Sequence, residues 1–155
     1  MFKKIVVGLS LAITLVTASF AGNQVEAASY HTKAIKVAKS ELGTKYKMGG
    51  ISSSGFDCSG LVKYSYQKAG KSLPRTAADI YKKGKKVKSL QKGDLMFFAP
   101  NKAKTPTHVA IYIGNNEFIH SSSSKGVSYA KTNNSYWKPK YIGAKRIKYI
   151  GAKRI

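Results

Sequence analysis

The sequence contains only one cysteine, Cys58, in 155 residues, so the chain cannot form an internal disulfide. Its N-terminus is nevertheless typical of an exported protein. Lys3 and Lys4 precede an apolar stretch from Ile5 to about Phe20, and the small residues Val25 and Ala27 follow it. Because exported proteins usually pair their cysteines, an unpaired one is a candidate reactive thiol.

The apolar stretch is short for a membrane span, and no later segment is apolar enough to be one. We therefore expect residues 1–27 to be a signal peptide cleaved after Ala27, with an uncleaved anchor as the alternative. Residues 28–147 are long enough for a single domain. Residues 148–155 repeat residues 140–147 without a change, so we interpret them as a duplicated C-terminal tail.

Acidic residues are also scarce, with 6 Asp and Glu against 28 Lys and Arg and a formal net charge of +22. Such a charge favours polyanionic partners through counterion release and electrostatic steering. Nucleic acid is the usual inference for a basic chain. An exported protein, however, meets anionic cell-wall polymers or lipid headgroups, so we expect wall polymers and no nucleic acid as its partners. We expect a monomer that is secreted to the cell wall or the extracellular space.

The spacing of apolar residues changes from helical to alternating along the chain. It predicts a helix from about His31 to Leu42, a Gly/Ser loop over 43–55, a helix that begins at Asp57 and ends at Gly70, and a short helix to about Lys82. Four strands bounded by turns are predicted over 94–99, 108–114, 117–121 and 127–131, with a hairpin turn at 114–116. Helices followed by antiparallel strands indicate an α+β fold.

Cys58 falls on the first turn of its predicted helix, where the helix dipole favours an anion, so we expect a lowered thiol pKa and a partial thiolate at neutral pH. A cysteine nucleophile also needs a base and a group that orients the base. His108 and His120 lie on neighbouring predicted strands and can supply both, whereas His31 is expected to be a solvated surface residue. No zinc-type ligand spacing is present, so neither a metal nor another cofactor is expected.

Six ordered sequence blocks resemble the NlpC-type family of cell-wall cysteine peptidases over about residues 34–147. The blocks are Tyr46-Lys-Met-Gly-Gly50, Asp57-Cys-Ser-Gly-Leu-Val62, Leu73-Pro-Arg-Thr76, Gly93-Asp-Leu-Met-Phe-Phe98, His108-Val-Ala-Ile-Tyr-Ile-Gly114 and Phe118-Ile-His-Ser121. The resemblance implies a compact papain-like domain in which N-terminal helices pack on a small antiparallel sheet. It implies Cys58 as nucleophile, His108 as base and His120 as the orienting residue, with Tyr46, Asp57 and Ser59 lining the substrate cleft.

The same resemblance implies a peptidoglycan endopeptidase that cuts stem peptides between D-glutamate and the diamino acid. Two departures from the family pattern, Asp79-Ile-Tyr81 and Ala110, do not touch the expected triad. The residues alone leave two other interpretations open. One is a wall amidase or acyltransferase with the same triad, and the other is a non-catalytic cationic wall-binding protein. Asp57 is also open to interpretation as a plain helix cap.

Overall fold

The computed structural model describes residues 18–148, and their side chains from Ser29 onward. Three helices precede most of the strands: α1 (Ala18–Ser40), α2 (Cys58–Lys68) and α3 (Ala77–Lys83). A two-stranded sheet pairs β1 (Ile51–Ser52) with β2 (Gly55–Phe56). The main sheet contains β3 (Lys85–Val87), β4 (Leu95–Phe98), β5 (His108–Gly114), β6 (Glu117–Ser122), β7 (Gly126–Lys131) and β8 (Tyr141–Arg146), and short 3-10 helices occur at η1 (Pro100–Lys102) and η2 (Lys138–Lys140).

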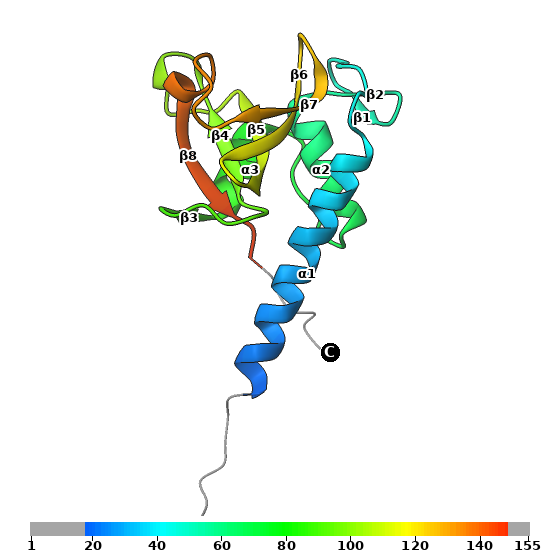
Figure 1. The fold of residues 1–155 in the computed structure, drawn as a ribbon, viewed down its shortest axis with the longest axis vertical. Coiled ribbons are helices and arrows are strands. Elements are labelled where there is room, and N and C mark those ends of the chain that lie inside the picture. Colours follow the sequence, from blue (N-terminus) through cyan, green and yellow to red (C-terminus); the bar gives the residue numbers. More distant parts are fainter. Residues whose placement is uncertain (1–17, 149–155) are drawn as a thin grey trace, which may run out of the picture.

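The main sheet has the strand order β3-β8-β4-β5-β6-β7, and all its pairs are antiparallel. Strands β5 and β6 are joined by a tight turn in which Asn115 and Asn116 both have positive φ, 51° and 57°. Asparagine tolerates this conformation, and two such residues match the twist of a hairpin. The predicted turn is confirmed, and it brings the strands that carry His108 and His120 side by side (Figure 1).

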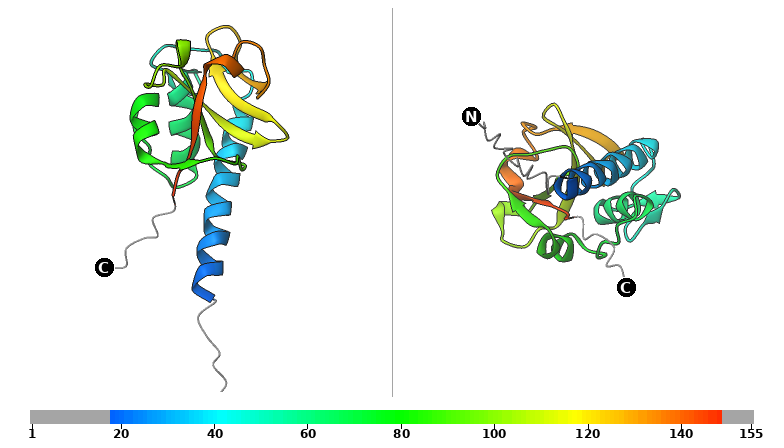
Figure 2. Two further views of the ribbon diagram at one scale, coloured as in Figure 1. Left: turned by 90° about the vertical axis from the view of Figure 1, so that its left-hand side faces the viewer. Right: turned by 90° about the horizontal axis from the view of Figure 1, so that it is seen from below.

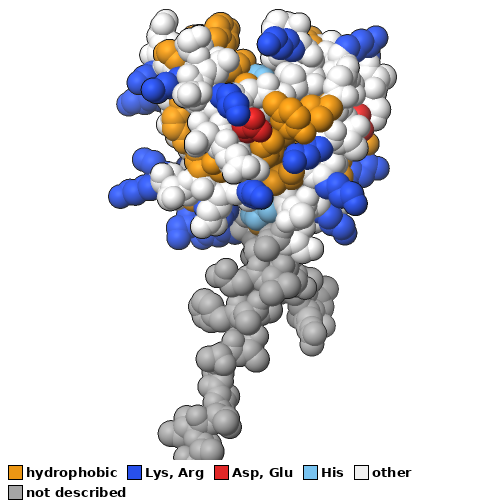
Figure 3. All heavy atoms as spheres, in the orientation of Figure 1, with side chains coloured by type: hydrophobic (Ala, Val, Ile, Leu, Met, Phe, Trp, Pro, Cys, Tyr) orange, Lys and Arg blue, Asp and Glu red, His pale blue; other side chains and the backbone are white. Residues whose placement is uncertain are grey.

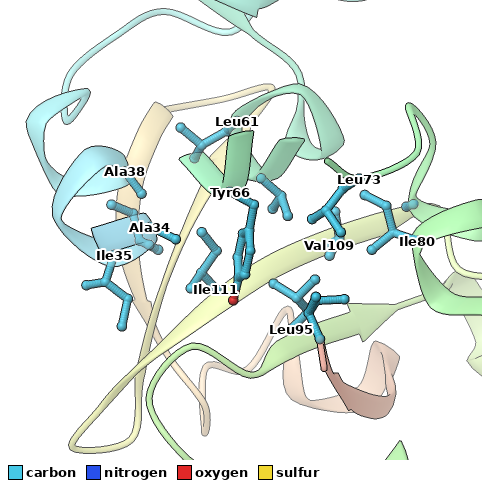
Figure 4. Packing of buried hydrophobic residues seen from close by; sticks show 14 of the residues in the cluster. Ala34, Ile35, Ala38, Leu61, Tyr66, Leu73, Ile80, Leu95, Val109 and Ile111 are labelled. Atoms are coloured by element: carbon cyan, nitrogen blue, oxygen red, sulfur yellow. The ribbon is translucent and has the colours of Figure 1, made fainter. Parts of the chain in front are cut away.

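Because successive side chains of a strand point to opposite faces of the sheet, the core has two parts. Leu95 and Phe97 of β4 belong to the larger cluster, which also contains the buried apolar residues of all three helices. Figure 4 shows Tyr66 of α2 in the middle of this cluster, with Ala34 and Ala38 of α1 on one side. Met96 and Phe98 belong to a smaller cluster with Ala110 and Phe118. Both faces of the sheet are therefore covered, one by helices and the other by side chains of the strands and of residues 137–141.

A buried polar network ties α1 to the sheet. The Tyr66 hydroxyl donates its hydrogen to the carbonyl of Gly93, and the same oxygen lies 3.0 Å from Nδ1 of His31. Because a phenol has one hydrogen, Nδ1 of His31 must be the donor in the second bond. The Tyr30 hydroxyl donates to the carbonyl of Ile147, which follows β8. His31 is only 8% exposed, so the expectation of a solvated surface histidine was wrong.

A second polar contact joins the strand ends. Asp94 is completely buried, and its two carboxylate oxygens lie 2.7 and 2.8 Å from the Arg146 guanidinium. Its Oδ2 also accepts the backbone N–H of Gln91. Removing one partner of such a buried pair typically costs about 3–5 kcal/mol because the other charge is left unpaired. The pair therefore locks β8 to the start of β4.

The expected α+β layout is confirmed, with some differences in the elements. Helix α1 begins at Ala18 instead of about His31, and its N-terminal part projects from the body of the domain (Figure 2). The β1–β2 hairpin lies inside the segment expected to be a loop, and the lysine-rich β3 was not predicted. These strands have two or three residues each, too few for an alternating pattern to be recognised.

The two ends of the sequence are only partly described. The expected cleavage position after Ala27 falls within α1, and residues 1–17 lie outside the described residues. The closing strand β8 uses the first copy of the C-terminal repeat, and only Lys148 of the second copy is described. Within residues 18–148, none of the helices combines the length and the apolar content that a bilayer span requires.

His31 should make the folding stability depend on pH. Burial lowers the pKa of His31 to about 4 from 6.5, so only the unfolded chain binds a proton there between these values. The free energy of unfolding should therefore rise with pH across this window, with a contribution from His31 of at most about 3 kcal/mol that is fully present above pH 6.5 and lost below pH 4. Urea unfolding at several pH values measures it.

The matched variant is His31→Gln, because its amide can still donate to Tyr66 but does not titrate. His108 and His120 contribute a slope of the same sign, so the difference between wild type and variant isolates His31. Parallel stability curves for the two proteins would contradict the assignment.

Candidate active site

Cys58 is the first residue of α2. Asp57 is the N-cap, with extended backbone, and its Oδ1 accepts the N–H of Gly60 at 2.7 Å, as the sequence predicts. The Cys58 Sγ lies 3.8 Å from the carbonyl oxygen of Thr107, the residue just before β5. The start of α2 therefore sets the thiol against the first residues of β5.

His108 and His120 form a hydrogen-bonded pair. The antiparallel pairing of Ile111 with Ile119 places position 110 opposite His120, so His108 is its diagonal neighbour on the same sheet face. Their rings are perpendicular, and Nε2 of His108 lies 2.9 Å from Nδ1 of His120. The structure thus brings together the two histidines that the sequence predicted as partners. With Nε2 engaged, Nδ1 is the ring nitrogen of His108 that remains for another partner.

A cleft of about 450 Å³ opens in front of Cys58. Its lining residues come from the segment before β1, the start of α2, the start of α3 and the segment before β5; they are Tyr46, Asp57, Cys58, Ser59, Arg75, Thr76, Ala77, Ala78, Pro106 and Thr107. The cleft contains all three residues expected to bind substrate. It is a site where an extended substrate segment can reach the thiol.

Asp57 is more heavily engaged than a simple helix cap. Besides Gly60, its carboxylate accepts the backbone N–H of Gly49 at 3.1 Å and the hydroxyl of Ser59 at 3.3 Å. Two nitrogens of Arg75 lie 3.0 and 2.5 Å from its two oxygens, and a guanidinium nitrogen also lies 2.9 Å from Ser59 Oγ. Although burial opposes it, the Arg75 and backbone hydrogen bonds lower the pKa of Asp57 overall. Asp57 is therefore an ionised carboxylate with its lone pairs filled.

The electrostatics at Cys58 differ from the sequence expectation. Burial raises the pKa of the thiol, and the negative charge of Asp57 raises it further. The N–H groups of Val109, Ser59 and Cys58 itself lower it, but the burial effect is larger. The expected partial thiolate at neutral pH was wrong, because the dipole argument ignored the burial of the helix start.

The pKa values of His108 and His120 are lowered, whereas that of Cys58 is raised. Burial lowers the pKa of His108 to about 3, with a smaller contribution from His120. Burial also lowers the pKa of His120 to about 4, assisted by the positive charge of Lys125. The resting site at pH 7 therefore holds a neutral thiol and two neutral imidazoles. Among residues 29–148, His, Cys, Asp and Glu side chains nowhere form a group of three or more that could hold a metal ion.

Two site residues were missed at the sequence level. Arg75 stands in a block that carries the family resemblance, but nothing in its local pattern indicates that it faces Asp57 across 18 positions. Trp137 stacks on His108 with ring centroids 4.3 Å apart, from a segment with no periodic pattern. The only signal for Trp137 was that it is the single tryptophan of the chain.

A thiol at the start of a helix, packed against an antiparallel sheet that carries a histidine pair, is the layout of a papain-like α+β domain. The family comparison agrees: the model of the NlpC/P60 family matches residues 43–146, which contain Cys58, His108 and His120. The chain belongs to the NlpC/P60 family.

Similar proteins support this membership. The chain is 45% identical over 115 residues to the probable peptidoglycan endopeptidase LytE of Bacillus subtilis, which covers 74% of this chain and 34% of LytE. It is 46% identical over 121 residues to the gamma-DL-glutamyl hydrolase of the same organism, covering 73% of this chain and 29% of that protein. The chain thus spans about a third of the length of these relatives. A crystal structure of an NlpC/P60 protein from Bacillus cereus matches 75% of this chain and 39% of that chain, with a TM-score of 0.72 and 37% identity.

The raised thiol pKa predicts slow alkylation of Cys58 at neutral pH. The rate of reaction with iodoacetamide should rise with a midpoint above that of a free cysteine, about pH 8.5, since burial and Asp57 both disfavour the thiolate. His108→Ala should leave the midpoint in place because the neutral imidazole contributes no charge. A wild-type midpoint below about pH 7 would instead demonstrate a resting thiolate–imidazolium pair.

Proposed function

We propose that the protein is a secreted cysteine endopeptidase that hydrolyses peptidoglycan stem peptides at the bond between the D-glutamate side-chain carboxyl and the diamino acid. The observation that carries the proposal is the place of the Cys58 thiol: it lines a cleft and lies 3.8 Å from the carbonyl oxygen of Thr107, the residue that precedes His108. His108 in turn is joined to His120 by a 2.9 Å hydrogen bond. Relatives named peptidoglycan endopeptidase and gamma-DL-glutamyl hydrolase support the substrate class.

Cys58 acts as the nucleophile and His108 as its base. His120 holds Nε2 of His108, so Nδ1 is the nitrogen that takes the thiol proton. A neutral imidazole can accept that proton at the moment of attack, and the low pKa of His108 makes the resulting imidazolium a strong acid. As sulfur bonds to the amide carbon, the C–N bond breaks and His108 protonates the leaving amine. Water then hydrolyses the thioester and regenerates the thiol.

The negative charge that develops during attack needs donors. The Cys58 backbone N–H at the start of α2 has no partner within the helix ladder and is the natural oxyanion donor. Tyr46 lines the cleft and is the second donor in this proposal. Its pKa is raised, first by burial and then by the nearby Cys58 and Asp57, so its hydroxyl stays protonated and able to donate.

Tyr46, Asp57 and Ser59 form the substrate-binding side of the cleft in this proposal. The carboxylate of Asp57 is the negative charge that would attract the free amine of a stem peptide. Its existing bonds to Arg75 limit this role, because an incoming ammonium must share the carboxylate with a guanidinium. Asp57 would then recognise the amine only where the substrate displaces part of the Arg75 pair.

Defined stem peptides test both the bond and the role of Asp57. The wild-type protein should release a product ending in D-glutamate, identified by mass spectrometry, and Cys58→Ala should release none. If Asp57 receives the amine, Asp57→Asn should lower the preference for a free N-terminal L-alanine over an acetylated one by about tenfold in kcat/KM, equivalent to 1.4 kcal/mol.

Two controls distinguish amine recognition by Asp57 from a role as a helix cap alone. A cap-only role predicts equal, modest losses on both peptides, because weakening the start of α2 affects every substrate alike. Thr76→Ala, which removes the cap of α3 at the other side of the cleft, should give this uniform pattern. Cleavage between the sugar lactyl group and L-alanine would overturn the endopeptidase assignment in favour of an amidase.

We further propose that residues 1–27 direct export and that the basic surface attaches the domain to anionic wall polymers. Figure 3 shows Lys and Arg side chains spread over the visible face, with few acidic side chains among them. Most lysines are exposed, and the salt bridges to Lys82 and Lys131 are at the surface. Surface ion pairs of this kind leave the net charge available for long-range attraction.

Attachment through charge predicts that wall binding weakens with salt. The Cys58→Ala protein, which cannot digest its target in this proposal, should sediment with purified walls at low ionic strength and be released at high ionic strength. Walls stripped of their anionic polymers should retain much less protein at low salt. Binding that salt does not change would indicate recognition of the glycan or peptide instead.

A further inference from the structure

Trp137 covers the histidine pair on the side of the sheet opposite the helices. Its indole stacks on His108 with an interplanar angle of 23° and a centroid distance of 4.3 Å. The same ring meets His120 edge-on at 5.1 Å and Phe98 of β4 edge-on at 5.3 Å. One side chain thus contacts both imidazoles and the strand next to them.

The segment that carries Trp137 is held by hydrogen bonds. The Asn134 side-chain oxygen accepts the N–H groups of Tyr136 and Trp137 at 2.9 and 3.2 Å, which forms an Asx-type turn. The Lys140 N–H donates to the Trp137 carbonyl, and the Ala99 N–H at the end of β4 donates to the Lys140 carbonyl. The indole is therefore presented from a turn that leads into η2 and is anchored to the sheet.

We propose that Trp137 is a positioning residue: its indole holds His108 in the orientation that bonds His120 and keeps water from the imidazole pair. This inference rests on the proposed function of His108 as base. Two other rings lie near His108: His120, edge-on with a centroid distance of 5.1 Å, and Phe98 with a centroid distance of 5.9 Å. Neither of them stacks on the imidazole as Trp137 does. A stacked indole restricts the rotation of the ring and so keeps Nδ1 available on the side away from His120.

The pKa of His108 provides a measure of the role of the indole. The titratable groups that act on His108 and His120 are the two imidazoles themselves, which are hydrogen-bonded to each other, and Lys125 at the turn after β6. Burial is the largest cause of the low pKa of His108, and the indole is part of that burial. Removing the indole should let water reach His108 and raise its pKa toward the ordinary value of about 6.5.

NMR titration of the imidazole C–H signals provides the direct test. The chain has three histidines, and His31→Gln assigns the one outside the site. In wild type, His108 should show no titration above about pH 5, whereas in Trp137→Ala its midpoint should rise by at least about one pH unit, a tenfold change in proton affinity. An unchanged midpoint would overturn the proposal.

Kinetics on a stem peptide give a second readout. Trp137→Ala should lower kcat about tenfold at neutral pH with KM within about twofold, and the deficit should grow as the pH falls because protonated His108 cannot act as base. Tyr136→Ala is the matched control, because Tyr136 is the exposed neighbour that touches Trp137 but neither histidine. A uniform loss at all pH values, or an equal loss in Tyr136→Ala, would contradict a positioning role.

Two further variants cover a failure of Trp137→Ala to fold. Asn134→Ala releases the turn without removing an apolar side chain and should shift the His108 midpoint in the same direction, whereas Asn134→Asp keeps the acceptor and should restore the wild-type value. The NMR midpoints do not depend on activity. If wild type cleaves no stem peptide, the proposed function fails, and the titration still decides whether Trp137 controls the pair.

Discussion

The carboxylate of Asp57 is the contact on which the arrangement of the site depends. It caps α2 through Gly60, accepts the N–H of Gly49 from the loop before β1, and binds Arg75 from the segment before α3. Three separate segments of the chain therefore meet on one side chain next to Cys58. A close backbone contact reinforces the junction, because a Cβ on Gly60 would lie 1.9 Å from the carbonyl oxygen of Gly50. Only glycine permits α2 to begin this close to the loop, and this approach fixes the direction in which Cys58 points.

The pKa values of Cys58 and His108 are shifted in opposite directions by the same physical cause, which is burial. Burial raises the pKa of the Cys58 thiol and lowers the pKa of His108, and each shift favours the neutral form of its group. In the proposed mechanism, thiolate and imidazolium charges therefore form only during the reaction. The backbone N–H groups of Val109, Ser59 and Cys58, which bond to the sulfur, lower the free-energy cost of the thiolate. Cys58 in that mechanism becomes reactive only when a substrate carbonyl is placed in the cleft, and a neutral thiol is less susceptible to oxidation than a thiolate.

The sequence predicted those features that short-range patterns determine. Asp57 as N-cap, the strand at His108 and the Asn115–Asn116 turn follow from local rules. The N-cap places Cys58, and the strand and turn place the histidine pair. Arg75 and Trp137 could not be predicted in this way, because each reaches the site from a segment distant in sequence and without periodicity. His31 was misjudged for a different reason. Its position near the expected N-terminus suggested exposure, but α1 continues past it and packs it against Tyr66.

The edge strand β3 carries exposed lysines that affect how two copies of the domain can approach each other. An edge strand presents unpaired N–H and C=O groups to which a strand of another molecule can add. Here Lys85 and Lys86 are exposed on β3, which pairs with β8 along its other side. Two molecules that approach edge to edge would bring these lysines together, and their repulsion opposes growth of a shared sheet. The charge that we propose attracts the domain to polyanions would thus also keep neighbouring copies apart where they crowd on one surface.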